Sequence, residues 1–240
     1  MSPSFTRKSI AFLRALARNN DREWFRARKA EYDAHVRGPM VALLERLAGE
    51  FRRFAPELVA DPKVSLYRIY RDTRFSEDKS PLKTHLAAHF PHRAFGRRGG
   101  AGLYVEVAPR WVWMGGGIYR PETHELSAIR GHIDVHYRTL RRIVESSAFR
   151  KEAGPLHGEQ LARVPRGYPR DHPAAQYLRF RQFLAGREFP AEFAYDPHFY
   201  GELVRVFRRV APLVRFLNAP LLDRPIDPLI EDNRARPVNV

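Results

Sequence analysis

The residues best suited to chemistry lie close together, between Arg68 and Lys83. Three arginines, at positions 68, 71 and 74, fall within seven residues. Each guanidinium offers a fork of N–H donors that matches the oxygens of a carboxylate or a phosphate. The pattern predicts a pocket for a small anionic ligand. The side chains expected to bind that ligand are Arg68, Arg71, Arg74, Lys79, Lys83 and Arg120.

Proton transfer at such a pocket would need an acid or a base. His85 follows Lys83 closely, and histidine titrates near neutral pH. Asp72 and Asp78 lie inside the arginine-rich segment and are the other candidates for a catalytic role. Arg120 follows the glycines 115–117 and precedes a helix start at Pro121, where an anion is also expected.

A structural role for the same charges is the competing interpretation, because the aspartates can neutralise the arginines in a salt-bridge network. Internal pairing cannot satisfy every charge, since five cations face three carboxylates. The excess of two positive charges favours an anionic partner. The cations are Arg68, Arg71, Arg74, Lys79 and Lys83, and the carboxylates are Asp72, Glu77 and Asp78.

Metal chemistry has weaker support. Glu77-Asp78-Lys79 is similar to the acidic-x-Lys motif of metal-dependent nucleases, but a second acidic residue on a neighbouring strand cannot be identified. His132 and His136 are four residues apart on an expected helix, without the glutamate of an HExxH motif. We therefore predict no metal site, and the sequence identifies no cofactor.

The net charge of +15 makes nucleic acid the second candidate partner. The first 120 residues hold 23 of the 42 basic and 12 of the 27 acidic residues, so this half carries +11. Trp111 and Trp113 face the same side of an expected strand and belong either to the core or to a base-stacking platform. A scaffold protein is the third hypothesis. No nucleic-acid-binding motif is visible, and the interspersed carboxylates favour the small ligand.

Composition also indicates the cellular compartment and whether the chain enters a membrane. The chain has no cysteine, which excludes disulfides and thiolate sites and agrees with a reducing compartment. It shows neither a signal peptide nor an apolar stretch of the roughly 18 residues that a spanning helix needs. We expect a cytoplasmic protein that does not enter a membrane. The sequence does not indicate the oligomeric state.

The elements that must position the charged segment follow from periodicity and caps. The first sixty residues predict helices, the first over 7–18 after Thr6 and the second after Asp21, with Gly38-Pro39 as a break before the third. Strands are expected at 64–70, 85–90, 103–107 and 111–114. Helices return after Pro121, a long ordered loop covers 161–173, and 177–184 fits strand or helix. A last helix over 199–217 is expected to be interrupted at Pro212.

These elements describe one α+β domain over residues 1–218, with a small, mainly antiparallel sheet between N-terminal and C-terminal helices. Residues 219–240, which contain four prolines among charged residues, are expected to form an extended tail.

The run from Arg68 to Lys79 reads RxxRDxRFxxDK and resembles the signature of a bacterial and fungal family of conserved hypothetical proteins without an assigned function. The resemblance extends over nearly the whole chain to about Leu217 and implies no mechanism. Members usually carry a tyrosine soon after the lysine, where this chain has Leu82, so any role of that phenol cannot operate here. Other matching segments are Asn19–Phe25, Lys83–His85, Gly115–Pro121 and Leu161–Pro173.

Overall fold

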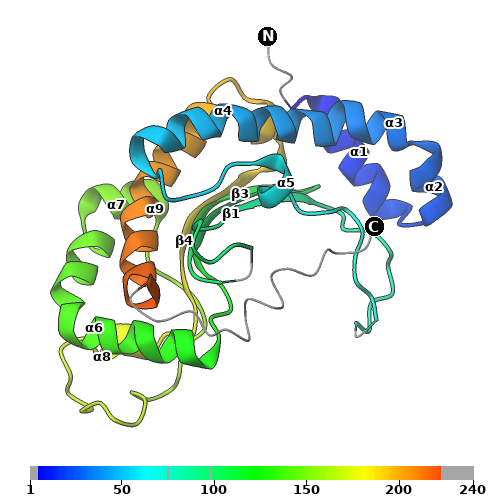
Figure 1. Ribbon diagram of the computed structural model, residues 1–240. Helices are drawn as coiled ribbons and strands as arrows, with labels where there is room; N and C mark the ends of the chain where they lie inside the picture. Colours follow the sequence, from blue (N-terminus) through cyan, green and yellow to red (C-terminus); the bar gives the residue numbers. More distant parts are fainter. Residues whose placement is uncertain (1–4, 75, 98, 223–240) are drawn as a thin grey trace.

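The N-terminal part of the chain is a group of helices (Figure 1). α1 (Arg7–Arg18) follows Thr6, and α2 (Arg22–Ala27) follows Asp21. The Asp21 carboxylate accepts two backbone N–H groups of the first turn at 2.8 and 2.9 Å, as expected for a cap. Both helix starts confirm the sequence prediction. The computed structural model describes residues 5–74, 76–97 and 99–222.

The predicted break at Gly38-Pro39 takes the form of a π-helical turn. α3 (Lys29–Tyr32) runs into a π-helix (Asp33–Arg37), which continues directly into α4 (Gly38–Phe54). A Cβ atom at Gly38 would lie 2.9 Å from the Asp33 carbonyl oxygen, so the wide turn leaves room only for glycine. Pro39 lies in the first turn of α4, as predicted.

The prediction of a strand at residues 64–70 is wrong. The chain forms a short helix, α5 (Pro62–Ser65), whose first turn is capped by the Asp61 carboxylate. The following residues pair with a later segment only through isolated bridges, Leu66 with Ala88 and Tyr70 with Leu82. An aspartate followed by a proline is a helix-start signal, and here it outweighs the β-branched residues that follow.

A four-stranded antiparallel sheet forms the centre of the fold, as predicted. Its strands are β1 (Leu86–Phe90), β2 (Gly102–Val107), β3 (Trp111–Ile118) and β4 (Phe183–Pro190), in the order β1-β2-β3-β4. The ambiguous segment 177–184 contains both the end of a helix and the beginning of β4. The long connection between β3 and β4 places β4 beside a strand that is distant in sequence.

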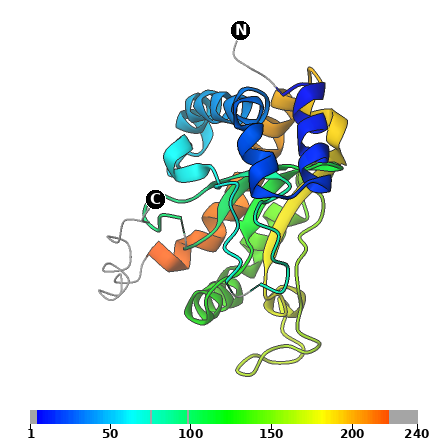
Figure 2. The same ribbon diagram turned by 90° about the vertical axis from the view of Figure 1, so that its right-hand side faces the viewer.

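One face of the sheet forms the core. Leu103, Val105 and Met114 point to this face and are fully buried, beneath α4 and α9 (Phe199–Leu222). The rings of Phe51 of α4, Phe90 of β1 and Phe207 of α9 meet with centroids 5.1 to 6.1 Å apart. Figures 1 and 2 show these helices crossing the sheet.

The segment between β3 and β4 adds three helices and a long loop. The helices are α6 (Thr123–Val144), α7 (Ser147–Ala153) and α8 (Ala175–Leu178). Residues 154–174, between α7 and α8, contain neither helix nor strand, which confirms the predicted loop at 161–173. A 3₁₀-helix (Ala191–Tyr195) links β4 to α9.

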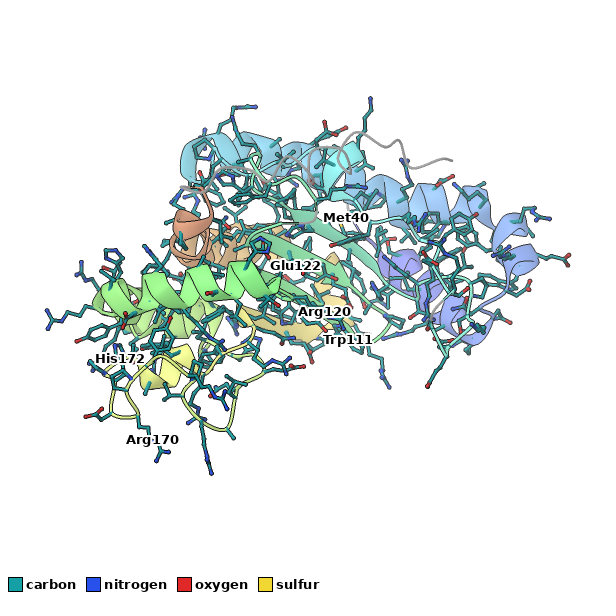
Figure 3. All side chains as sticks on the ribbon, turned by 60° about the horizontal axis from the view of Figure 1, so that its bottom comes forward. Met40, Trp111, Arg120, Glu122, Arg170 and His172 are labelled. Atoms are coloured by element: carbon teal, nitrogen blue, oxygen red, sulfur yellow. The ribbon has the colours of Figure 1, made fainter. Side chains whose placement is uncertain are left out.

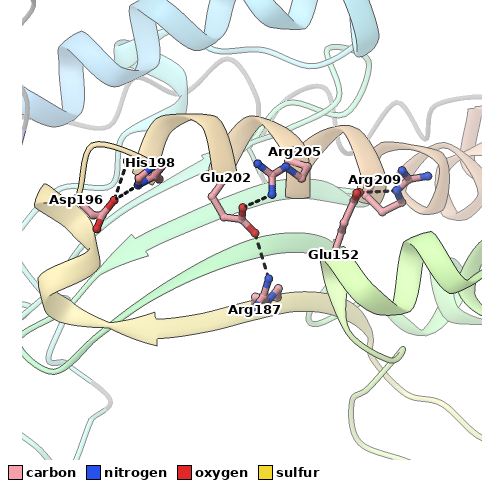
Figure 4. Close-up of polar contacts among 7 residues, drawn as sticks. All are labelled: Glu152, Arg187, Asp196, His198, Glu202, Arg205 and Arg209. Carbon is pink, nitrogen blue, oxygen red and sulfur yellow. Dashed lines mark hydrogen bonds and ion pairs between the residues drawn. The ribbon is translucent and has the colours of Figure 1, made fainter.

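Ion pairs connect α9 to its neighbours (Figure 4). Glu202 of α9 binds Arg187 of β4 at 3.1 Å and Arg205 at 2.8 Å, and Arg209 binds Glu152 of α7 at 2.8 Å. The helix continues past Pro212 and Pro220 to Leu222, four residues beyond the predicted start of the tail. The rest of the predicted tail lies outside the described residues. The chain is a single α+β domain, and none of its described helices is long and apolar enough to cross a membrane.

Candidate functional site

The arginine-rich loop pairs most of its charges internally. Arg71 binds Asp78, and Arg74 binds Asp72 through two hydrogen bonds of 2.8 and 3.0 Å. The Lys79 ammonium donates to a backbone carbonyl within the loop at 3.1 Å. The structure therefore brings the predicted catalytic aspartates against two of the predicted ligand-binding arginines. Phe75 of the signature lies outside the described residues.

This pairing makes both aspartates weak bases. Hydrogen bonds from Arg74 lower the pKa of Asp72 to about 2. The pKa of Asp78 is also lowered, by hydrogen bonds from Ser80 and Arg71. A carboxylate held ionised in this way is a poor proton acceptor near neutral pH. The catalytic role of Asp72 and Asp78 stays a prediction, and these contacts do not support it.

Arg68 and Lys83, like Lys79, are cations of this segment that the loop leaves without a carboxylate, and Lys79 instead donates to the backbone. Among the described residues, no carboxylate lies within 4.0 Å of either charged group. Lys83 is half-buried, and its Nζ lies 4.7 Å from the ring centroid of Tyr67. Burial lowers the pKa of Lys83, the positive charge of Arg68 lowers it further, and Glu106 opposes the shift.

The face of the sheet opposite the core carries a second set of functional groups, and we call it the outer face. It is defined by the half-buried side chains Tyr104 and Glu106 of β2 and Trp111 and Trp113 of β3. One Glu106 oxygen accepts from the Tyr104 hydroxyl at 2.7 Å, and the other accepts from the Trp111 Nε1 at 3.1 Å. Both carboxylate oxygens are thus engaged. The tryptophans share one face, as predicted, and of the two alternatives for them the core position is wrong, because both are half-buried on the face opposite the core.

His85 belongs to the same group. It is half-buried immediately before β1, and burial lowers its pKa. Glu106 opposes this shift, while Lys83 and Arg71 add to it. The imidazole is therefore neutral at neutral pH, a state in which it can accept a proton. His85 and Lys83 lie next to Glu106 in space, although more than twenty residues separate them along the chain.

Glycines allow side chains of the outer face to lie directly against the sheet backbone. A Cβ atom at Gly186 would lie 2.4 Å from Trp113 Cζ2, and a Cβ atom at Gly115 would lie 2.7 Å from Trp113 Cη2. The indole therefore rests directly on the backbone of β3 and β4. His89 lies in the same way on Gly102, where a Cβ atom would meet its Nε2 at 2.3 Å. The glycines of β3 have a packing role, the structural interpretation of this motif.

Asn20 attaches the charged segment to the helical layer. Its side-chain amide donates to the Leu82 carbonyl at 2.8 Å and accepts from the Leu82 N–H at 3.0 Å. The Leu82 side chain is buried in the core. Asn20, which follows α1, thus holds the segment that ends in Lys83. Leu82, which stands where relatives usually have a tyrosine, is a core residue.

Arg120 does not join the cluster around Lys83. Strand pairing puts the start of β1, and hence Lys83, at the Trp111 end of β3, whereas Arg120 follows the other end. The eight residues of β3 span roughly 25 Å. Figure 3 shows Arg120 near Glu122 at the first turn of α6. The predicted ligand-binding set is therefore divided between two places.

A carboxylate of the chain itself already occupies the N-terminus of α6. The buried Glu125 carboxylate accepts from the backbone N–H of Glu122 at 2.8 Å and of Gly100 at 3.0 Å. It supplies the negative charge that a helix N-terminus favours. Among the described residues no three His, Asp or Glu side chains are placed to hold a metal ion.

Tyr67, Tyr104 and Glu106 are the members of the site that sequence reasoning missed. Tyr104 and Glu106 lie at alternating positions of β2, and Tyr67 lies beside β1, where its N–H donates to the Ala87 carbonyl at 3.0 Å. No local pattern distinguishes these residues from other surface residues. The alternation of β2 predicts that Tyr104 and Glu106 share a face. Only the register with β1 and β3 places that face beside Lys83 and Trp111.

These observations define a class of protein: an α+β domain built on a four-stranded antiparallel sheet, with an aromatic outer face. The family model described as "Conserved hypothetical protein (DUF2461)" matches residues 8–216, and the chain belongs to this family. No curated protein and no solved structure matches the chain.

Proposed function

We propose that the outer face binds a small anionic ligand, whose phosphate or carboxylate group is held by Lys83 and Arg68. The observation that supports this most directly is the half-buried Lys83 ammonium without a carboxylate among the described residues within ion-pair distance. Removing a charge from water is costly unless an opposite charge compensates it. Glu106 is close enough to affect Lys83, but both of its oxygens accept other hydrogen bonds.

The remaining groups suggest what else the ligand contains. Tyr67 and Trp113 offer aromatic surfaces for an apolar or planar part, and 41% of the Tyr67 surface is exposed. The neutral imidazole of His85 is available to accept a proton from a ligand bound at Lys83. We therefore propose binding as the function, with His85 as the group for proton transfer if a reaction follows. A cytoplasmic location is part of the same proposal.

A thermal-shift series with Lys83→Met tests this function. The wild type is expected to melt at a higher temperature with phosphate, sulfate, citrate or a nucleotide, because a ligand that binds only the folded state stabilises it. Lys83→Met is expected to remove the rise. Lys151→Met is the matched control, since Lys151 is exposed on α7 and far along the chain from the cluster.

The variant also reports on the fold itself. Because methionine removes a half-buried charge, Lys83→Met without ligand is expected to melt at the same or a higher temperature than the wild type. If anions raise the melting temperature of Lys83→Met as much as that of the wild type, the proposal is contradicted. Arg71→Ala is expected to leave the protein folded at a cost of about 1 kcal/mol, since the Asp78 side chain of this ion pair is 60% exposed, although that of Arg71 is 25% exposed. Unfolding of Arg71→Ala would instead support the scaffold hypothesis.

Nucleic acid is the second candidate, and one observation favours it. Trp113 lies flat on Gly115 and Gly186, so that its indole can stack on a base, and Tyr67 and Lys83 flank the same surface. Fluorescence anisotropy with labelled single-stranded DNA and RNA at several salt concentrations tests this. Affinity that falls steeply with salt and is weakened by Trp113→Ala would support it. Absence of binding at low salt would exclude it.

A further inference from the structure

A cavity of about 680 Å³ lies between the first turns of α6 and the loop that precedes β4. Its volume falls within the roughly 300–1,000 Å³ typical of small-molecule sites. Arg120 lies at its rim after β3, and Arg130 lies deeper on α6. Arg166 and Arg181 come from the loop side. The cavity is therefore formed by three segments that are distant in the sequence.

The charges that line this cavity are unbalanced. Four arginines face Glu159, the one acidic residue among the described residues that line it. Glu159 lies 3.5 Å from Arg181, so three guanidiniums remain without a carboxylate inside the cavity. This differs from the signature loop, where two of the three arginines pair with aspartates. An excess of three positive charges in a concave site attracts a ligand with more than one negative charge.

The walls of the cavity are held in place by hydrogen bonds. Arg130 donates from Nε to the Leu178 carbonyl at 3.0 Å and from Nη2 to the Phe180 carbonyl at 3.2 Å. His172 on the loop binds Asp134 of α6 at 2.8 Å. Arg130 thus joins α6 to the end of α8, and His172 joins the loop to α6. The site is thus largely formed before a ligand binds, which lowers the entropy cost of binding.

Hydroxyl groups and rings complete the lining. Thr123 and Ser127 are four residues apart and lie on the same face of α6 as Arg130. Tyr119, which is 58% exposed, and Tyr168 supply aromatic surface. Since Glu125 already satisfies the start of α6, the arginines rather than the helix terminus would bind the anion. Arginine forks with nearby hydroxyls and rings suit a phosphate attached to a planar or sugar group.

The geometry points to a second anion site in this cavity, one that takes a phosphorylated small molecule with at least two negative charges, such as a nucleotide. Arg120, Arg166 and Arg181 bind its phosphate oxygens, and Arg130 holds the wall behind them. This site is separate from the cluster at Lys83 and does not depend on the function proposed for that cluster.

Inorganic pyrophosphate is the probe, with sulfate at equal ionic strength as the comparison. At about 100 times its dissociation constant, pyrophosphate is expected to raise the melting temperature of the wild type by roughly 5 to 10 °C. The double variant Arg166→Ala/Arg181→Ala is expected to bind on the order of 100-fold more weakly, because two charge-assisted hydrogen-bond donors are lost. Calorimetry measures this affinity directly.

The same loop offers a matched control. Arg163 and Arg170 are exposed, do not line the cavity, and Arg170 lies at the outer end of the loop in Figure 3. Arg163→Ala/Arg170→Ala removes the same net charge and is expected to bind pyrophosphate like the wild type. Circular dichroism of both double variants checks that they fold, and Arg130 is left unchanged because its hydrogen bonds join α6 to the end of α8.

Several outcomes would overturn the inference. These are the absence of a pyrophosphate effect beyond that of sulfate, equal loss in both double variants, and undiminished binding by Arg166→Ala/Arg181→Ala. Loss of binding in Lys83→Met with retention in the double variant would assign the anion to the outer face instead, and only the proposal for Lys83 would survive. Binding of a single-stranded oligonucleotide, but not pyrophosphate, through Arg166 and Arg181 would indicate a nucleic-acid surface.

Discussion

His89 makes the stability of this protein depend on pH. It lies on β1 at the outer face, with its ring against Gly102, where a Cβ atom would collide with Nε2. Burial lowers its pKa from 6.5 to about 4, and Arg97 contributes in the same direction. The imidazole is therefore neutral in the folded state at pH values where it is protonated in the unfolded chain.

The sign and size of the effect follow from this difference. Between pH 4 and 6.5 the unfolded state binds more protons at this residue, so the free energy of unfolding rises with pH. The contribution is complete above pH 6.5 and is lost as the pH falls to about 4. Each pKa unit corresponds to about 1.36 kcal/mol, so His89 accounts for about 3 kcal/mol across this range.

Urea unfolding at pH 7 and pH 4 measures this loss. His89→Gln keeps a polar side chain of similar length and cannot titrate, so the variant is expected to lose about 3 kcal/mol less than the wild type between these pH values. Other groups that titrate in this range are unchanged and cancel in the comparison. His157→Gln, at an exposed loop position, is the control and is expected to behave like the wild type. Equal losses in the wild type and His89→Gln would refute the reasoning.

Two further predictions concern packing and hydrogen bonds. Asn218 of α9 is 1% exposed and exchanges hydrogen bonds of 2.7 and 3.0 Å with the backbone of Ala101, so Asn218→Ala is expected to cost about 3 kcal/mol in urea unfolding. Asn19→Ala, which removes an exposed amide, is expected to cost less than about 1 kcal/mol, and equal costs would contradict this account. Gly186→Ala is expected to cost about 1 to 3 kcal/mol and to change the tryptophan fluorescence, because the new Cβ displaces Trp113. Gly131→Ala, on an open face of α6 with no atom within 4 Å of the new Cβ, is expected to stabilise by up to about 1 kcal/mol.

Local signals predicted the helices well. The caps at Thr6 and Asp21 and the spacing of apolar residues correctly indicated α1, α2 and α6. These signals act within one or two turns, so the neighbouring residues are sufficient to read them. The prediction for residues 64–70 was wrong because two local signals competed there. The Asp61-Pro62 helix start prevailed over the β-branched residues, and the chain beyond α5 pairs with its neighbour only at single bridges.

The candidate site was predicted less completely. The charge excess between Arg68 and Lys83 correctly indicated that internal pairing is incomplete, since Arg68, Lys79 and Lys83 have no carboxylate partner among the described residues. Sequence spacing could not tell which arginines pair, because Arg71 and Asp78 are seven residues apart in an irregular loop. It also could not reveal Tyr67 or Glu106, whose relation to Lys83 depends on how the strands align.

The sequence by itself determined the family, the α+β class, the helix starts and the unequal charge of the segment from Arg68 to Lys83. These properties depend on composition and on residues close together in the chain. Only the tertiary structure decided that Lys83 and His85 lie beside Glu106, that Trp113 rests on Gly115 and Gly186, and that Arg120 joins Arg166 and Arg181 instead of Lys83. Strand register and loop docking bring together residues that are distant in sequence, and a shift of one position would turn each strand side chain to the opposite face.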